Sequence, residues 1–304
     1  MGWKNRISQA QDRMTGHVRQ TPVMSARIEG HVVSLKFEQM QLTGSFKARG
    51  AFNTLLQTDV PEAGIVAASG GNHGAAVACA AAALGYRARI YVPEIAGPAK
   101  IALIRAQGAD LHVVPGAYAE AAARAAEWQA ATGAVQVHPY DAEATVAGQG
   151  TVFSEWEAQG LEADTVLIAV GGGGLVAGAL GWFQGQRKVV AVEPQTSCAL
   201  HAALTAGAPV DVDVSGVAAN ALGARRIGEI CFELARSNAL DSVLVPDTAI
   251  TEAQAVLWRE FRQLVEPAGA AALAALLSGA YRPAPGERVA VLICGGNIAP
   301  DPLG

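Results

Sequence analysis

The chain has 304 residues, a net charge of −5, and 16% charged against 51% hydrophobic residues. A chain of this length buries a large core and favours two structural units over one. Its 22 lysines and arginines form no basic run, which argues against nucleic acid and anionic lipid as partners and favours a small molecule.

The remaining bulk features describe the compartment and the cysteine chemistry. The N-terminal segment is polar and no apolar run is long enough to cross a bilayer, so we expect a cytoplasmic protein without a membrane partner. The cysteines show no CxxC spacing and the histidines no HxxxH pair. These spacings indicate neither a disulfide framework nor a zinc site.

From residue 64 onward, short β-branched runs alternate with alanine-rich helical stretches. The predicted strands are IVAAS (65–69), RARIYVP (87–93), DLHVVP (110–115), AVQVHP (134–139), TVLIAV (165–170), KVVAVEP (188–194), SVLVP (242–246) and RVAVLICGG (288–296). Two predicted helices end at Gly85 and Gly108, where a helix-terminating glycine belongs. The alternation predicts an α/β fold with two open, mostly parallel, twisted sheets and helices on both faces.

The order of these elements also predicts the domain organisation. We expect a small lobe at residues 64–144, inserted in a large lobe built from residues 1–63 and 145–304. The active site would lie in the cleft between the two lobes.

A run of four glycines follows the strand that ends at residue 170 and opens a helix. Without side chains, the backbone can fold tightly and direct several N–H groups at an anion, which favours a phosphate site. A plain tight turn and a dinucleotide site remain alternatives. The dinucleotide spacing is only loosely imitated by Gly171, Gly173, Val176 and Glu193.

Three further stretches carry candidate ligand contacts. Ser69 and Asn72 follow a strand and could hold a carboxylate or a ring hydroxyl, although either could simply cap a helix. Cys294 ends a buried strand, where a cysteine is often a core residue. Glu266 precedes Pro267, a pair that also marks an ordinary helix start. Together with Lys47, the four stretches predict one ligand that has a phosphate, a ring hydroxyl and an atom that pairs with a thiol, all near a lysine. Pyridoxal phosphate has all of these features.

Six stretches resemble, in order and spacing, the fold-type II pyridoxal-phosphate enzymes of the serine/threonine dehydratase (threonine ammonia-lyase) and serine racemase group. They are SFKARGAFN, SGGNHGAAVA, AGQGT, GGGGL, EPAGAAALA and CGGN. The resemblance covers nearly the whole chain and implies the two-lobed architecture of the tryptophan synthase β-like fold. Relatives with this fold are usually dimers or tetramers, so it implies a homodimer or a homotetramer.

The resemblance implies a role for each motif residue. Lys47 would carry the cofactor as a Schiff base with Phe46 beside the ring, Asn72 would bond the ring hydroxyl, and Cys294 would face the pyridine nitrogen with Glu266 nearby. The phosphate would be held by Gly171, Gly172, Gly173, Gly174 and Leu175. The substrate carboxylate would be held by Ser69, Gly70, Gly71, Asn72 and His73.

The chemistry of these side chains agrees with the implied roles. A lysine must be neutral to form an imine, and both burial and a neighbouring cation such as Arg49 would lower the pKa of Lys47. After the amino acid displaces it, the Lys47 amine can act as the base at Cα. The Cys294 thiol can only share a hydrogen bond with the pyridine nitrogen, which makes the ring a weaker electron sink.

These features predict elimination of water from L-threonine or L-serine, giving a 2-oxo acid and ammonia. Alternatives are another β-hydroxy amino acid such as 3-hydroxyaspartate, serine racemisation, or a nucleotide-binding oxidoreductase that uses the glycine run. Racemases of this group carry a serine where this chain has Gly70, which favours elimination.

Some relatives bind a divalent cation near the segment that corresponds to residues 208–223. Glu193, Asp211 and Asp213 are the acidic candidates for a Mg²⁺ or Ca²⁺ site in this chain. The alternative is a turn with two solvated aspartates.

Overall fold

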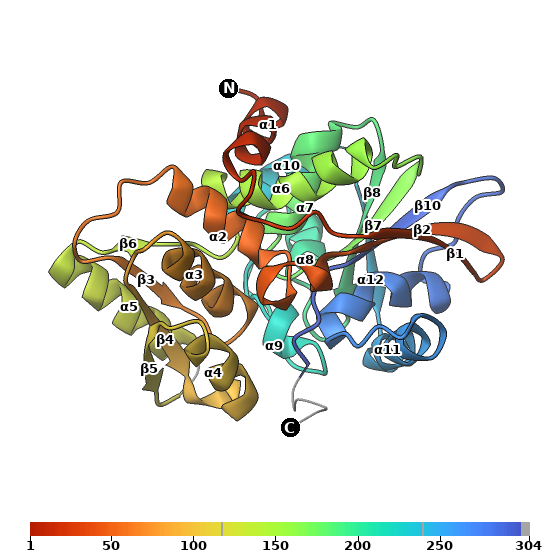
Figure 1. The fold of residues 1–304 in the computed structure, drawn as a ribbon. Helices are drawn as coiled ribbons and strands as arrows, with labels where there is room; N and C mark the ends of the chain where they lie inside the picture. Colours follow the sequence, from red (N-terminus) through yellow and green to blue (C-terminus); the bar gives the residue numbers. More distant parts are fainter. Residues whose placement is uncertain (117, 239, 299–304) are drawn as a thin grey trace.

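Two separate sheets organise the protein (Figure 1). The computed structural model describes residues 1–116, 118–238 and 240–298. The larger sheet has the order β1 (Val23–Ile28), β2 (His31–Phe37), β10 (Val289–Ile293), β7 (Thr165–Ala169), β8 (Lys188–Pro194) and β9 (Leu240–Val245). The smaller sheet has the order β5 (Asp110–Val114), β4 (Ala88–Pro93), β3 (Ile65–Ala68) and β6 (Val135–Gln136).

All eight predicted strands are present, and every strand pairing in the described residues except β1 with β2 is parallel. The antiparallel β1–β2 hairpin was missed by the sequence analysis. Its turn is formed by Glu29 and Gly30, both with positive φ, and a glutamate at this place is a weaker hairpin signal than asparagine or aspartate.

Helices cover the sheets and connect their strands (Figure 1). They are α1 (Trp3–Arg13), α2 (Lys47–Leu56), α3 (Asn72–Ala83), α4 (Pro98–Arg105), α5 (Tyr118–Thr132), α6 (Glu143–Ala158), α7 (Gly174–Phe183), α8 (Ala199–Ala206), α9 (Ala219–Leu222), α10 (Glu229–Ser237), α11 (Asp247–Phe261) and α12 (Pro267–Leu277). Gly85 and Gly108 both have φ near +80°, which confirms that glycine ends the two predicted helices. No helix in the described part of the chain is both long and apolar enough to span a bilayer.

Each sheet has its own apolar packing. Alternate residues of β3 face opposite sides, because Ile65 and Ala67 belong to one buried cluster whereas Val66 and Ala68 belong to another. The larger sheet is covered by α12, which packs along β7 to β10, and by α7, which is itself covered by α6 and α10. The predicted α/β fold with two mostly parallel sheets is therefore confirmed.

The strands of the smaller sheet all come from residues 65–136, between the two parts of the larger sheet. The boundary expected at residues 144 and 145 falls in the first turn of α6. The lobe limits 64–144 remain a prediction. Helix α2 packs on α3, which covers the smaller sheet, and on α6, which packs on α7 of the larger sheet. Its first residue, Lys47, therefore lies between the two sheets.

Candidate active site

Three of the predicted motifs follow the carboxyl ends of the parallel strands β3, β7 and β10, the usual place for a ligand site in open α/β sheets. Residue Ser45 forms a bridge with Gly295 just after β10, and the N–H of Phe46 donates to the Cys294 carbonyl oxygen at 3.2 Å. These contacts bring the start of α2 against the end of β10. The lysine motif and the CGGN motif thus share one site.

Lys47 is half-buried at the first position of α2. Its Nζ donates a hydrogen bond to the Pro139 carbonyl oxygen at 2.7 Å and lies 5.1 Å from the centre of the Phe46 ring. Burial lowers the pKa of Lys47 to about 8, although nearby Cys294 acts in the opposite direction. A substantial neutral fraction at physiological pH suits an amine that must form an imine.

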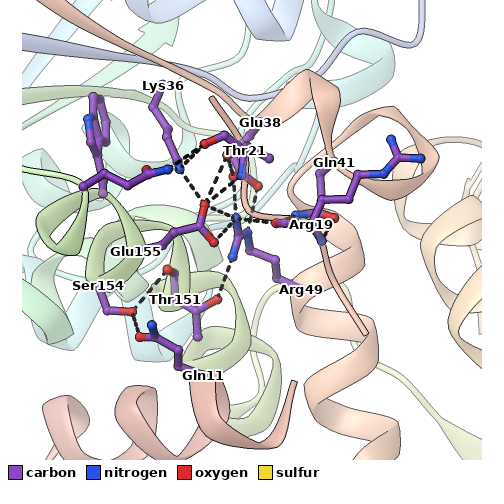
Figure 2. Close-up of polar contacts among 12 residues, drawn as sticks. Gln11, Arg19, Thr21, Lys36, Glu38, Gln41, Arg49, Thr151, Ser154 and Glu155 are labelled. Carbon is purple, nitrogen blue, oxygen red and sulfur yellow. Dashed lines mark hydrogen bonds and ion pairs between the residues drawn. The ribbon is translucent and has the colours of Figure 1, made fainter. Parts of the chain in front are cut away.

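Arg49 does not contribute to this shift, contrary to our expectation. Its side chain points into a buried network between β2, α2 and α6, shown in Figure 2. The guanidinium donates to Glu38 at 2.7 and 2.9 Å and to the Glu155 carboxylate at 3.0 Å, and Glu155 also accepts from Lys36. Two carboxylates therefore compensate the charge of this arginine within the network. The network ties α2, and with it Lys47, to β2 and α6.

Asn72 links the two sheets through side-chain hydrogen bonds. Its Nδ2 donates to Glu266 Oε1, and its Oδ1 accepts from Asn297 Nδ2 at 2.7 Å. Glu266 precedes α12 and is 2% exposed, so that burial raises the pKa of its carboxyl. The motifs predicted Asn72 and Glu266 in one site but gave no role to Asn297, the last residue of CGGN. Asn297 also donates to the Thr43 carbonyl oxygen, so it connects the loop around Asn72 with the segment that precedes Lys47.

The glycine run forms a cradle into which side chains do not fit. A Cβ on Gly171 would lie 3.1 Å from Leu222 Cα, and one on Gly173 would lie 2.5 Å from the Cys231 sulfur. Gly173 has φ of +92° and precedes α7. A Cβ on Gly174 would lie 2.9 Å from Tyr140 Cα. These close approaches explain why glycine is required and leave backbone N–H groups at the start of α7.

The cradle and Lys47 are joined through neighbouring residues. Tyr140 follows Pro139, the hydrogen-bond acceptor of Lys47, and its ring occupies the place of a side chain on Gly172. Leu175 is buried in the first turn of α7. A phosphate at the start of α7 and an imine at Lys47 therefore belong to the same part of the molecule, as pyridoxal phosphate requires. The residues present fit that cofactor.

Cys294 lies at the end of β10 with its thiol 3.2 Å from the Ala268 carbonyl oxygen. Burial raises the pKa of this thiol well above its usual range, and the charge of Glu266 acts in the same direction. The group therefore stays a neutral thiol, which agrees with the hydrogen-bonding role expected for it.

The loop from Ser69 to His73 leads from β3 into α3. Ser69 Oγ accepts from the Gly71 N–H at 3.2 Å. His73 Nε2 donates to the Val137 carbonyl oxygen at 2.8 Å, and burial together with the charge of Lys47 lowers its pKa to about 3. The imidazole of His73 is thus neutral and bonded to the backbone, and its predicted contact with the substrate carboxylate stays a prediction. At Gly70, a Cβ would collide with Ala96 Cβ and lie 3.3 Å from Pro93 Cδ.

The three acidic residues named as candidate cation ligands are not gathered into one cluster, and a divalent cation site stays a prediction. Within the described residues, no group of three His, Cys, Asp or Glu side chains could hold a metal ion. Glu193 is fully buried and accepts the N–H groups of Leu200 and His201 at 2.8 Å, so it holds the start of α8. Asp211 pairs with Arg226 on the surface, and Asp213 does not join them in such a group.

Comparisons with known proteins agree with this geometry. A family model described as pyridoxal-phosphate dependent enzyme matches residues 14–295. A phenylserine dehydratase from Ralstonia pickettii is 35% identical, over 94% of this chain and 90% of the relative. Maize serine racemase superposes with a TM-score of 0.92 at 30% identity, over 98% of this chain and 94% of that one. A T.th. threonine deaminase superposes with a TM-score of 0.90 at 34% identity, over 98% and 99%.

Proposed function

The chain belongs to the family of pyridoxal-phosphate-dependent enzymes, and we propose that within it the protein eliminates water from L-threonine and L-serine. The products would be 2-oxobutyrate and pyruvate, each with one equivalent of ammonia. The chain is similar to a dehydratase, a deaminase and a racemase alike, so similarity does not choose between elimination and racemisation. We base that choice on the residues of the site.

Five parts of the site would hold the cofactor. They are Lys47 for the aldehyde carbon, the N–H groups of the 171–175 loop for the phosphate, Asn72 for the ring hydroxyl, Cys294 for the ring nitrogen and Phe46 beside the ring. Once bound, pyridoxal phosphate supplies an electron sink for the charge that develops at Cα of the amino acid.

Lys47 would move the proton that starts the elimination. With a pKa of about 8 its amine is partly neutral near physiological pH, and a neutral amine can accept the Cα proton of the substrate. The Pro139 carbonyl oxygen, at 2.7 Å, orients the amine. Cys294, held as a neutral thiol by burial, offers only a hydrogen bond, and the resulting weak electron sink favours prompt loss of a β-substituent.

The observation that carries the choice of elimination is Gly70. Racemases of this group resemble the chain but have a serine at this place, where it acts as the second acid/base group. Here glycine provides no such group, and the contacts with Ala96 and Pro93 leave no room for a side chain. Without a hydroxyl at position 70, return of the proton to the opposite face of Cα is disfavoured.

The test combines spectroscopy with a product assay. We expect purified protein, supplemented with pyridoxal phosphate, to show the absorbance of a lysine-bound cofactor at roughly 410–420 nm and to release 2-oxobutyrate from L-threonine. Lys47→Ala should lose both signals, whereas Lys188→Ala, which removes a lysine paired with Asp241 on the surface, should keep both. Absence of the band after addition of pyridoxal phosphate would refute the cofactor assignment.

A substrate panel decides between the close alternatives. L-threonine, L-serine, 3-hydroxyaspartate and phenylserine would be compared by kcat/KM, the last because a phenylserine dehydratase matches nearly the full chain. Chiral analysis of L-serine reactions measures D-serine. Formation of D-serine faster than pyruvate would contradict elimination as the main reaction, and a preference for another panel member would replace threonine as the substrate.

A further inference from the structure

Lys100 is a buried cation with few hydrogen-bond partners. It is 6% exposed, and in the described residues its Nζ makes one hydrogen bond, to the Asn220 carbonyl oxygen at 3.4 Å. Among the ion pairs of residues 1–116, 118–238 and 240–298, Lys100 takes part in none. A lysine carries three donor hydrogens, and burying an ammonium without a counterion is costly.

The local sequence does not explain a lysine at this place. Lys100 lies in the first turn of α4, two residues after the Pro98 that begins the helix. This end of a helix disfavours cations, because its free N–H groups carry partial positive charge. Burial lowers the pKa of Lys100, and the charge of Glu266 opposes the shift from beyond ion-pair distance. Within the described residues, the Lys100 ammonium therefore has no anion at ion-pair distance.

Lys100 points toward the loop between β3 and α3. A Cβ on Gly71 would lie 3.8 Å from Lys100 Nζ and 3.7 Å from the Asn220 carbonyl oxygen. Lys47 acts on the same loop, since its charge contributes to the low pKa of His73. Two lysines therefore lie near this loop. Lys47 is the one whose place the substrate nitrogen would take, and Lys100 lies beside the loop backbone. An α-amino acid carries its amine and its carboxylate on one carbon, so its carboxylate would lie at this loop when its nitrogen has replaced Lys47.

We propose that Lys100 binds the carboxylate of the amino-acid substrate, with the backbone of the 69–73 loop. This inference deepens the proposed function and rests on it. It makes the substrate carboxylate the counterion of Lys100 and a bridge between α4 and the larger sheet. Amino acids with a free carboxylate would then be preferred over their amides.

The test measures binding rather than turnover. L-alanine has the amine and the carboxylate but no β-hydroxyl, so it can bind and cannot lose water. Its dissociation constant, and that of L-alaninamide, would be measured by calorimetry on holoenzyme carrying Lys100→Met, Lys100→Gln or Lys100→Arg. Arg105→Gln, an exposed cation of the same helix, is the matched control.

We expect Lys100→Met and Lys100→Gln to weaken L-alanine binding about tenfold or more, as for loss of a charge-assisted hydrogen bond. Lys100→Arg should retain most of the affinity, and L-alaninamide binding should change little in any variant. Pyridoxal phosphate affinity, measured by its absorbance, should be unchanged and reports that each variant is folded.

Three results would overturn the inference. The first is unchanged L-alanine affinity in Lys100→Met and Lys100→Gln, and the second is no L-alanine binding by the wild type. The third is a loss confined to pyridoxal phosphate affinity, which would assign Lys100 to the cofactor phosphate. Failure of the proposed function looks different, because the Lys100-dependent L-alanine binding would then persist without 2-oxo acid release from any β-hydroxy amino acid.

Discussion

Asn72, at the start of α3, donates its side-chain N–H to Glu266, at the start of α12. The two residues are 194 positions apart in sequence and belong to helices that pack on different sheets. Because Asn297 donates to the same asparagine, one amide joins three motifs. This side chain therefore holds the walls of the site together.

Asn72→Ala is expected to lower the free energy of unfolding by about 1–3 kcal/mol, since it leaves the buried Glu266 carboxyl without its donor. Urea unfolding of the cofactor-free protein measures this cost. Asn5→Ala, an exposed asparagine in α1, is the control and should change stability little. Equal stabilities for the two variants would contradict a structural role for Asn72.

The rate of cofactor capture should rise with pH. With a pKa of about 8, roughly a tenth of Lys47 is neutral at pH 7 and about nine tenths at pH 9. Only the neutral amine attacks the aldehyde of pyridoxal phosphate, so the initial rate measured by absorbance should climb through pH 8 and then level off. A flat profile between pH 7 and 9, or one that rises only above pH 10, would show that burial does not tune this lysine.

Gly174→Ala should weaken pyridoxal phosphate binding by about tenfold or more. The new Cβ would lie 2.5 Å from Gln149 Oε1 and 2.9 Å from Tyr140 Cα, and overpacking of this kind displaces backbone. The dissociation constant is measured by titration of the cofactor absorbance. Gly2→Ala meets no atom within 4 Å and serves as the control. Wild-type affinity in Gly174→Ala would mean that the cradle does not hold the phosphate.

Glu155→Gln should destabilise the protein by about 3 kcal/mol, because Lys36 and Arg49 then lose part of their compensating charge in a buried site. Glu157→Gln, in the same helix, breaks a half-exposed pair with Arg187 and should cost less than about 1 kcal/mol. Chemical denaturation of both variants tests the difference. A cost for Glu155→Gln no larger than that for Glu157→Gln would refute the stabilising role of the network.

The sequence by itself determined the eight parallel strands and the glycines that end α3 and α4. It also predicted the site motifs around Lys47, Asn72, Cys294 and residues 171–175, which the fold brings into one region. These features are local: β-branched runs between helices encode parallel strands, and a glycine run encodes backbone that side chains cannot occupy. The ordered motifs also predicted the family, which the comparisons confirmed.

The tertiary structure alone decided where the charged side chains point. Arg49 follows Lys47 by two residues, yet it turns to Glu38 and Glu155, while Lys47 turns to a carbonyl 92 residues away. Glu193, named from the sequence only as a candidate metal ligand, accepts two backbone N–H groups and holds the start of α8. No sequence motif distinguishes Lys100 from the other lysines, and its burial beside Gly71 is a result of the tertiary fold. The partner of a charge is set by long-range packing, because desolvation forces each buried ion toward whichever opposite group the fold brings within reach.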